Sequence, residues 1–160
     1  MSRRVALLHS FTESKWVSCQ TITSNLVSSL TEALKGSQIK VFDFNQSDNK
    51  YDFLKLIEEV YEYRPERIVF CDHRPQPDFF ICEYLKHFSQ EQAEHIPEFF
   101  VHVYGDFSLD LKEWKNVQEE LIEKRVHFIC ASDKQQKLVS GWINSPEGIV
   151  SKCQIGRAHV

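Results

Sequence analysis

The sequence predicts an α/β fold in which a mostly parallel sheet of five to six strands lies between two layers of helices. Apolar strand-like runs alternate with helix-like stretches along the chain, the pattern of parallel strands joined by helical crossovers. Most positions of each run are apolar, as expected for strands buried on both faces. The runs are residues 5–8, 39–42, 68–71, 99–103 and 127–131, with a shorter apolar stub at 149–150. We therefore expect a Rossmann-like three-layer αβα sandwich.

The stretches between the runs carry helix signals. The first has apolar residues at four-residue spacing, typical of one helix face: Ile22, Leu26, Leu30 and Leu34. Gly36 marks its end. The second helix should stop before Pro65, because the residue preceding a proline is pushed out of the α region. Pro77 suits the first turn of the third helix, and Asp110 is a candidate N-cap for the fourth. A last helix should follow the fifth run.

Length and composition indicate one ordinary globular domain. The chain has 160 residues, 42% of them hydrophobic and 26% charged, within the usual range for such a domain. A net charge of −4 provides no basic surface for nucleic acid. The apolar run after Arg4 is shorter than the roughly seven residues of a signal peptide core. No run approaches the ~18 apolar residues of a membrane span.

The five cysteines argue for a reducing compartment. Their number is odd and they contain no C-x-x-C pair, so neither disulfides nor a zinc site is supported. Cys71 and Cys130 fall inside predicted strands and should be buried. The histidines also lack metal-ligand spacing. We expect a cytoplasmic protein without a metal or a cofactor.

Several common chemistries of this fold class lack their motifs. The segment after Leu8 contains no glycine, so the G-x-G-x-x-G dinucleotide fingerprint is missing. The sequence has neither the P-loop pattern nor the G-x-S-x-G nucleophile elbow. Dehydrogenases, P-loop nucleotide hydrolases and α/β-hydrolases are therefore not indicated.

Polar residues follow the predicted strands. In an open parallel sheet, ligands bind outside the carboxyl ends of the strands, so these residues are the candidate site. They are Ser10, Thr12 and Trp16 after the first strand, Asp72, His73 and Arg74 after the third, Tyr104, Gly105 and Asp106 after the fourth, and Ser132 after the fifth.

Several segments resemble the N-terminal domain of GT-B glycosyltransferases, the group with a "glycosyl transferases group 1" C-terminal domain. Ala131-Ser132, the lysine-containing stretch 134–138 and the proline-containing stretch 146–152 resemble the end of that domain. Residues 101–107 resemble its strand ending in His-Gly or His-Asp, and 68–73 its strand ending in an acid or histidine pair. The resemblance covers roughly residues 3–152, through loose motifs. Two features depart from the family: residues 10–14 replace its frequent Gly-Gly, and Tyr104 stands where a family histidine would lie.

The resemblance implies transfer of a hexose from a sugar nucleotide to a sugar or lipid-linked acceptor, without metal. His73 and Asp106 are then the expected catalytic residues. An imidazole that titrates near neutral pH suits a base or a hydrogen-bonding group, and Asp106 could accept a bond from a sugar hydroxyl. The remaining candidates would bind the acceptor: Ser10, Thr12, Trp16, Asp72, Arg74, Tyr104, Gly105 and Ser132.

The resemblance also implies a domain organisation. Residues 1–153 would form the acceptor-side domain, and residues 155–160 match the translation of a short-read sequencing adapter, a match that extends into codon 154. We therefore expect residues 154–160 to be a non-native tail and the natural protein to continue into a second domain that binds the sugar nucleotide. This chain alone should then be inactive. Peripheral membrane contact of the full-length protein stays open.

Structural interpretations compete with these roles. Asp72 could cap a loop beside a solvated His73, and Ser132 is well placed as a helix N-cap. His9 could simply be the last residue of its strand, and His102, inside a strand, is expected to be a core histidine. The alternative function is a stand-alone Rossmann-like, flavodoxin-like ligand-binding or regulatory domain without catalysis, although the first loop lacks the residues of a phosphate cradle.

Overall fold

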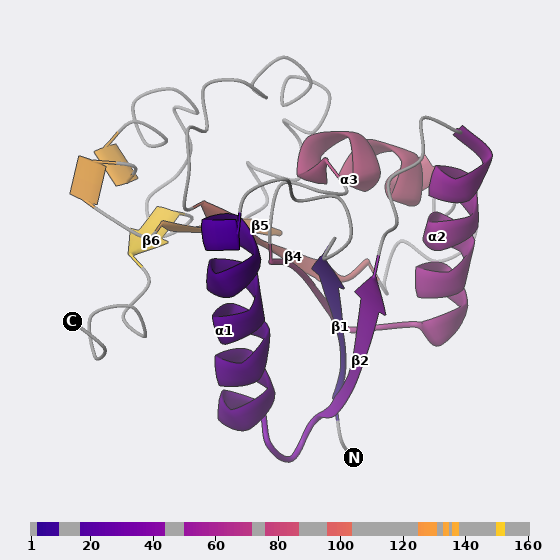
Figure 1. Ribbon diagram of the computed structural model, residues 1–160. Coiled ribbons are helices and arrows are strands. Elements are labelled where there is room, and N and C mark those ends of the chain that lie inside the picture. The colour runs from indigo at the N-terminus through magenta and orange to yellow at the C-terminus, as the bar shows by residue number, and fades with distance from the viewer. Residues whose placement is uncertain are drawn as a thin grey trace.

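The computed structural model describes residues 3–9, 17–43, 50–71, 76–86, 96–103, 125–130, 133–134, 136–137 and 150–152. In these ranges strands and helices alternate as predicted up to residue 103 (Figure 1), and most of the residues between the last three strands lie outside the described ranges. The strands are β1 (Arg4–His9), β2 (Gln38–Asp43), β3 (Arg67–Phe70), β4 (Glu98–Val103), β5 (Val126–Cys130) and β6 (Val150–Lys152). The helices are α1 (Val17–Ala33), α2 (Lys50–Tyr63) and α3 (Pro77–Lys86).

The strands form one sheet in the order β2-β1-β3-β4-β5-β6, and every neighbouring pair is parallel. The chain passes from β1 to β2 on one side, then returns to β3 on the other side of β1. This reversal is a topological switch point, and it lies between β1 and β3. The order 2-1-3-4-5 is that of flavodoxin-like sheets, here extended by β6, and differs from the 3-2-1-4-5-6 order of dinucleotide-binding sheets.

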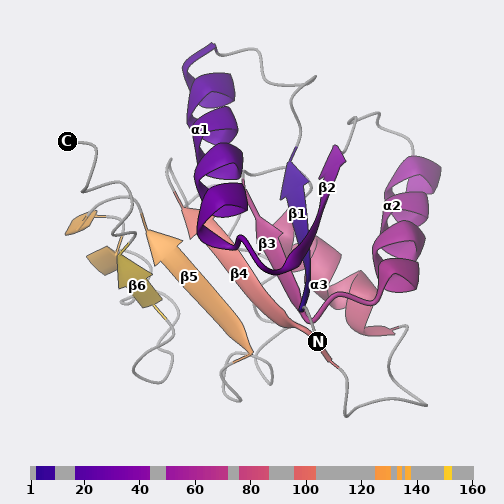
Figure 2. The same cartoon turned by 90° about the horizontal axis from the view of Figure 1, so that it is seen from below.

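Helices cover both faces of the sheet (Figures 1 and 2). On one face, a cluster is formed by Val5, Leu7, Val69 and Cys71. Against it pack apolar side chains of α1 and of the residue after it, namely Leu26, Val27, Leu30 and Leu34. On the opposite face, α2 and α3 pack against the intervening residues of the same strands, such as Ala6 and Leu8. This alternation follows from the two-residue period of a strand. The predicted three-layer α/β sandwich is confirmed.

The helix ends have the local causes that the sequence predicts. Gly36 has a φ of 112°, a conformation that a residue without Cβ adopts at little cost, and it follows the end of α1. Helix α2 ends at Tyr63, two residues before Pro65. Pro77 is the first residue of α3, where its missing N–H removes no intrahelical hydrogen bond.

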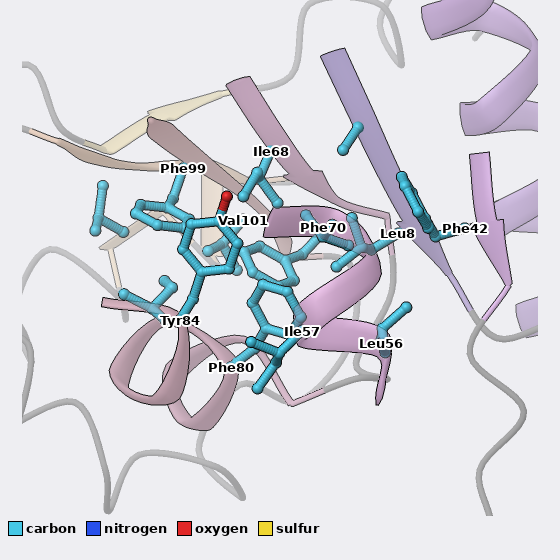
Figure 3. Close-up of a cluster of buried hydrophobic side chains, with 14 of the residues drawn as sticks. Leu8, Phe42, Leu56, Ile57, Ile68, Phe70, Phe80, Tyr84, Phe99 and Val101 are labelled. Carbon is cyan, nitrogen blue, oxygen red and sulfur yellow. The ribbon is translucent and has the colours of Figure 1, made fainter. Parts of the chain in front are cut away.

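An aromatic cluster joins α3 to the sheet (Figure 3). The Phe80 ring lies edge-on to Phe70 at 5.4 Å and stacks on Tyr84 at 5.6 Å, both between ring centroids. Tyr84 in turn lies edge-on to Phe99 at 6.0 Å. These four residues are fully buried, and such ring pairs add to the stabilisation from burial. The cluster holds α3 against the face of the sheet that α2 also covers.

Some sequence predictions lie outside the described residues. The predicted fourth helix is one, and of the last predicted helix only residues 133–134 and 136–137 are described, all of them helical. Of the predicted stub at 149–150, Val150 is described and begins β6, which pairs with β5. In the part of the chain that the structure describes, every helix is too short or too polar to cross a membrane.

Two neighbouring phenylalanines of α3 provide a matched test of the core. Phe80 is 0% exposed, whereas Phe79 is 38% exposed. We expect Phe80→Ala to lower the free energy of unfolding by about 3–5 kcal/mol, because it leaves a cavity among packed rings. Phe79→Ala should cost no more than about half of that, since much of its ring already contacts water. Urea denaturation of both variants measures the difference, and equal losses would contradict the described packing of α3.

Candidate functional site

All the predicted site residues lie outside the described residues. This applies to the predicted catalytic pair, His73 and Asp106, and to the predicted acceptor-binding residues Ser10, Thr12, Trp16, Asp72, Arg74, Tyr104, Gly105 and Ser132. What the structure does describe is the strand residue after which each segment begins. Because all strands are parallel, these strand ends lie at one edge of the sheet. The starting points of the predicted loops are therefore brought together, and the individual roles stay predictions.

Four residues with polar or thiol side chains form a row across this edge, named here the edge row: Asp43, His9, Cys71 and His102. His9 is paired in register with Asp43. Leu8 is in register with Phe70, and Phe70 with Val101, so the next residues along, His9, Cys71 and His102, continue the row. The row crosses β2, β1, β3 and β4 in their spatial order.

The edge row lies on the α1 side of the sheet. Cys71 belongs to the apolar cluster under α1, and Phe100 packs against the same cluster. Strand alternation therefore directs His102, two residues after Phe100, to that side. The same argument applies to His9, two residues after Leu7. At the carboxyl ends of these strands, the α1 face thus carries polar or thiol side chains.

His9 is buried beside an exposed carboxylate. It is 1% exposed, and its Nδ1 atom lies 3.7 Å from Oδ1 of Asp43, whose side chain is 44% exposed. Burial lowers the pKa of His9, because it penalises the charged imidazolium, and the Asp43 carboxylate opposes part of that effect. At neutral pH the imidazole is therefore uncharged and can both donate and accept a hydrogen bond.

His102 is bonded to the backbone instead. It is 7% exposed, and its Nδ1 atom lies 3.2 Å from the carbonyl oxygen of Cys71. A carbonyl oxygen only accepts, so Nδ1 carries the proton and donates it. The prediction of a core histidine is confirmed for its burial, and the bond gives this histidine a defined partner at the end of β3.

The thiols near this edge are buried. Cys71 and Cys130 are buried, as predicted, whereas Cys82 in α3 is partly exposed. Burial raises the pKa of Cys130 to about 11, because the thiolate would lose its hydration.

Within the described ranges, no group of three or more His, Cys, Asp or Glu side chains could hold a metal ion. A neutral imidazole and a carboxylate suit hydrogen bonding to a polar ligand or a proton relay.

Sequence reasoning missed the pairing of His9 with Asp43. Both residues end an apolar run, so each could be placed at the carboxyl edge. A sequence pattern does not state which strands are neighbours, however, and the 2-1-3 order decides that these two side chains meet. For His102, strand periodicity was sufficient to predict burial but carried no signal for its partner.

The buried His9 should make stability depend on pH. Its pKa is lower in the folded state than the usual value of 6.5, so below about pH 6.5 the unfolded state binds more protons and folding weakens as pH falls. Above that pH the contribution is constant. We expect His9→Asn to show a smaller loss of unfolding free energy between pH 7.5 and 5.5 than the unchanged protein, measured by urea denaturation at each pH.

Asp43→Asn provides the matched comparison. The Asp43 charge raises the pKa of His9, so removing it should lower that pKa further. The loss of stability on acidification should then be no smaller than in the unchanged protein. If the unchanged protein instead gained stability on acidification and Asp43→Asn removed that gain, the charge pair and not burial would control His9.

The thiols should differ in reactivity. With a pKa of about 11, only about one Cys130 thiol in a thousand is ionised at pH 8, and the thiolate is the form that reacts. We expect iodoacetamide to label Cys82 much faster than Cys130 in the folded protein, measured by mass spectrometry of the peptides. The two rates should converge in urea, and equal rates without urea would contradict the burial of β5.

Comparison with known proteins adds no identity. No family model matches the sequence, and neither a curated protein nor a solved structure matches it. The function has to be argued from the residues at the carboxyl edge.

Proposed function

We propose that this chain is the acceptor-side domain of a GT-B-like glycosyltransferase, with its acceptor site at the carboxyl edge of the sheet. One observation carries the proposal: the strand ends that precede all the predicted site segments meet at this edge. His9 and Cys71 flank the switch point between β1 and β3, where open α/β sheets bind their ligands. The segments following these two residues contain six of the predicted site residues.

The chemistry of the edge row fits a sugar or another polyhydroxylated acceptor. Hydroxyl groups donate and accept hydrogen bonds, and an uncharged His9 beside Asp43 can do both. A site built to hydrogen-bond hydroxyls discriminates strongly, because a missing partner leaves a buried polar group unpaired. In this proposal, His73 and Asp106 act on the acceptor hydroxyl, and a second domain binds the sugar-nucleotide donor.

The thiols support the proposed location. The sequence has an odd number of cysteines and no C-x-x-C pair, a pattern typical of a reducing compartment. On that ground we assign the protein to the cytoplasm, where sugar nucleotides are at hand for a hexosyltransferase. The acceptor, in this proposal, is a sugar or a lipid-linked sugar.

The strand order favours a second candidate function. The order β2-β1-β3-β4-β5 is that of flavodoxin-like domains, which also act alone as ligand-binding or regulatory modules. Such a protein would use the same carboxyl edge for a phosphate-bearing ligand. The segment after His9 contains no glycine, which weighs against a phosphate cradle there.

Ligand titration distinguishes the two candidates. We expect the purified chain to bind simple methyl hexosides weakly and to show no affinity for uridine, guanosine or adenosine diphosphate hexoses, measured by isothermal titration and by amide chemical shifts. His73→Ala and Asp106→Ala should each weaken hexoside binding by about tenfold or more, the effect of losing a hydrogen bond to a hydroxyl. Micromolar binding of flavin mononucleotide or a sugar nucleotide would instead support the stand-alone domain.

Two variants at the opposite end of the sheet serve as controls. His127 contacts Glu98 near the start of β4, and Glu66, just before β3, is paired with Arg3. His127→Ala and Glu66→Ala remove an imidazole and a carboxylate far along the strands from the carboxyl edge. Both should leave hexoside binding unchanged. If they weakened hexoside binding as much as His73→Ala and Asp106→Ala, the acceptor site could not be assigned to the carboxyl edge.

A further inference from the structure

The backbone of Cys71 is hydrogen-bonded to residues of two neighbouring strands. Its N–H donates to the carbonyl oxygen of Leu8 in β1, with 2.8 Å between nitrogen and oxygen. Its carbonyl oxygen accepts the bond from Nδ1 of His102 in β4 at 3.2 Å. Cys71 is the first residue after β3, so these two bonds fix the point where the chain leaves the sheet.

An imidazole is an unusual choice for the position of His102. The residue lies between β3 and β5 in the sheet and is in register with Ile129, a site where an aliphatic residue would supply packing alone. A buried imidazole costs free energy unless it is hydrogen-bonded. Its bond to the Cys71 carbonyl satisfies that need and, at the same time, satisfies a backbone acceptor beyond the end of the β3 ladder.

We propose that His102 is a positioning residue that ties the exit of the chain from β3 to β4, next to the switch point between β1 and β3. The side chain acts through the Cys71 carbonyl and needs no contact with a ligand. Its consequence for acceptor binding rests on the function proposed above, because Cys71 directly precedes Asp72, His73 and Arg74. The mechanical role itself can be tested without any ligand.

Two substitutions separate the hydrogen bond from packing. His102→Asn keeps an N–H donor at the same number of bonds from Cα as Nδ1, whereas His102→Leu has a similar shape without a donor. Cys71 itself reports the opening, because its thiol is buried in the folded protein. Cys130, a buried thiol on β5, reports global unfolding in the same sample.

We expect His102→Leu to speed alkylation of Cys71 by on the order of tenfold to a hundredfold, the effect of leaving a buried carbonyl without its partner. The Cys71 amide should gain hydrogen exchange in parallel. His102→Asn should restore most of the protection of Cys71. In each variant, the alkylation of Cys130 should change much less than that of Cys71.

Three results would overturn the proposal. Equal acceleration at Cys71 and Cys130 would mean that His102 only supports the core. An unchanged alkylation rate of Cys71 in His102→Leu would mean that the hydrogen bond does not restrain the chain. If His102→Asn behaved like His102→Leu, the N–H donor would not be the cause of the protection. Absence of hexoside binding, with the Cys71 pattern as expected, would refute the proposed function and leave the positioning role intact.

Discussion

Strand β1 is bonded to a parallel neighbour on each side and covered by helices on each face. Its residues Val5–Leu8 are at most 1% exposed, and both apolar clusters of the described chain include side chains from this strand. A strand so enclosed tolerates polar side chains only at its ends, because a buried polar group needs a partner. The position of His9 at the carboxyl end of β1 agrees with this constraint.

The two faces of the sheet have different roles. On the α2/α3 face, the rings of Phe70, Phe80, Tyr84 and Phe99 interlock (Figure 3) and make that side a rigid support. On the α1 face, the carboxyl ends of the strands carry the polar or thiol side chains of the edge row. A site held on strands, with a packed aromatic layer behind it, keeps its side chains in place with little freedom to move.

The two buried histidines of the edge row have different polar neighbours. His9 stays uncharged and lies 3.7 Å from the carboxylate of Asp43 on the edge strand β2. His102 lies between two strands and donates to a backbone carbonyl. The two imidazoles are thus one strand apart, one beside a carboxylate and the other bonded to the main chain, on either side of β3.

The sequence alone determined the elements, because their signals are local. Apolar runs predicted the strands, Gly36, Pro65 and Pro77 predicted helix limits, and burial of Cys71 and Cys130 followed from their place in those runs. It also predicted that the candidate residues follow strand ends at one edge of the sheet, since every strand of a parallel sheet ends on the same side. The loop residues chosen there, His73 and Asp106 among them, stay predictions.

Only the tertiary structure decided which strands are neighbours. The pairing of His9 with Asp43 and the bond from His102 to Cys71 join residues 34 and 31 positions apart, through the order β2-β1-β3-β4. Hydrophobic periodicity reports how a residue is oriented relative to its own strand and carries no information about the adjacent one. Strand order depends on how the helices of the long crossovers pack on the two faces of the sheet. That packing is a property of the whole chain.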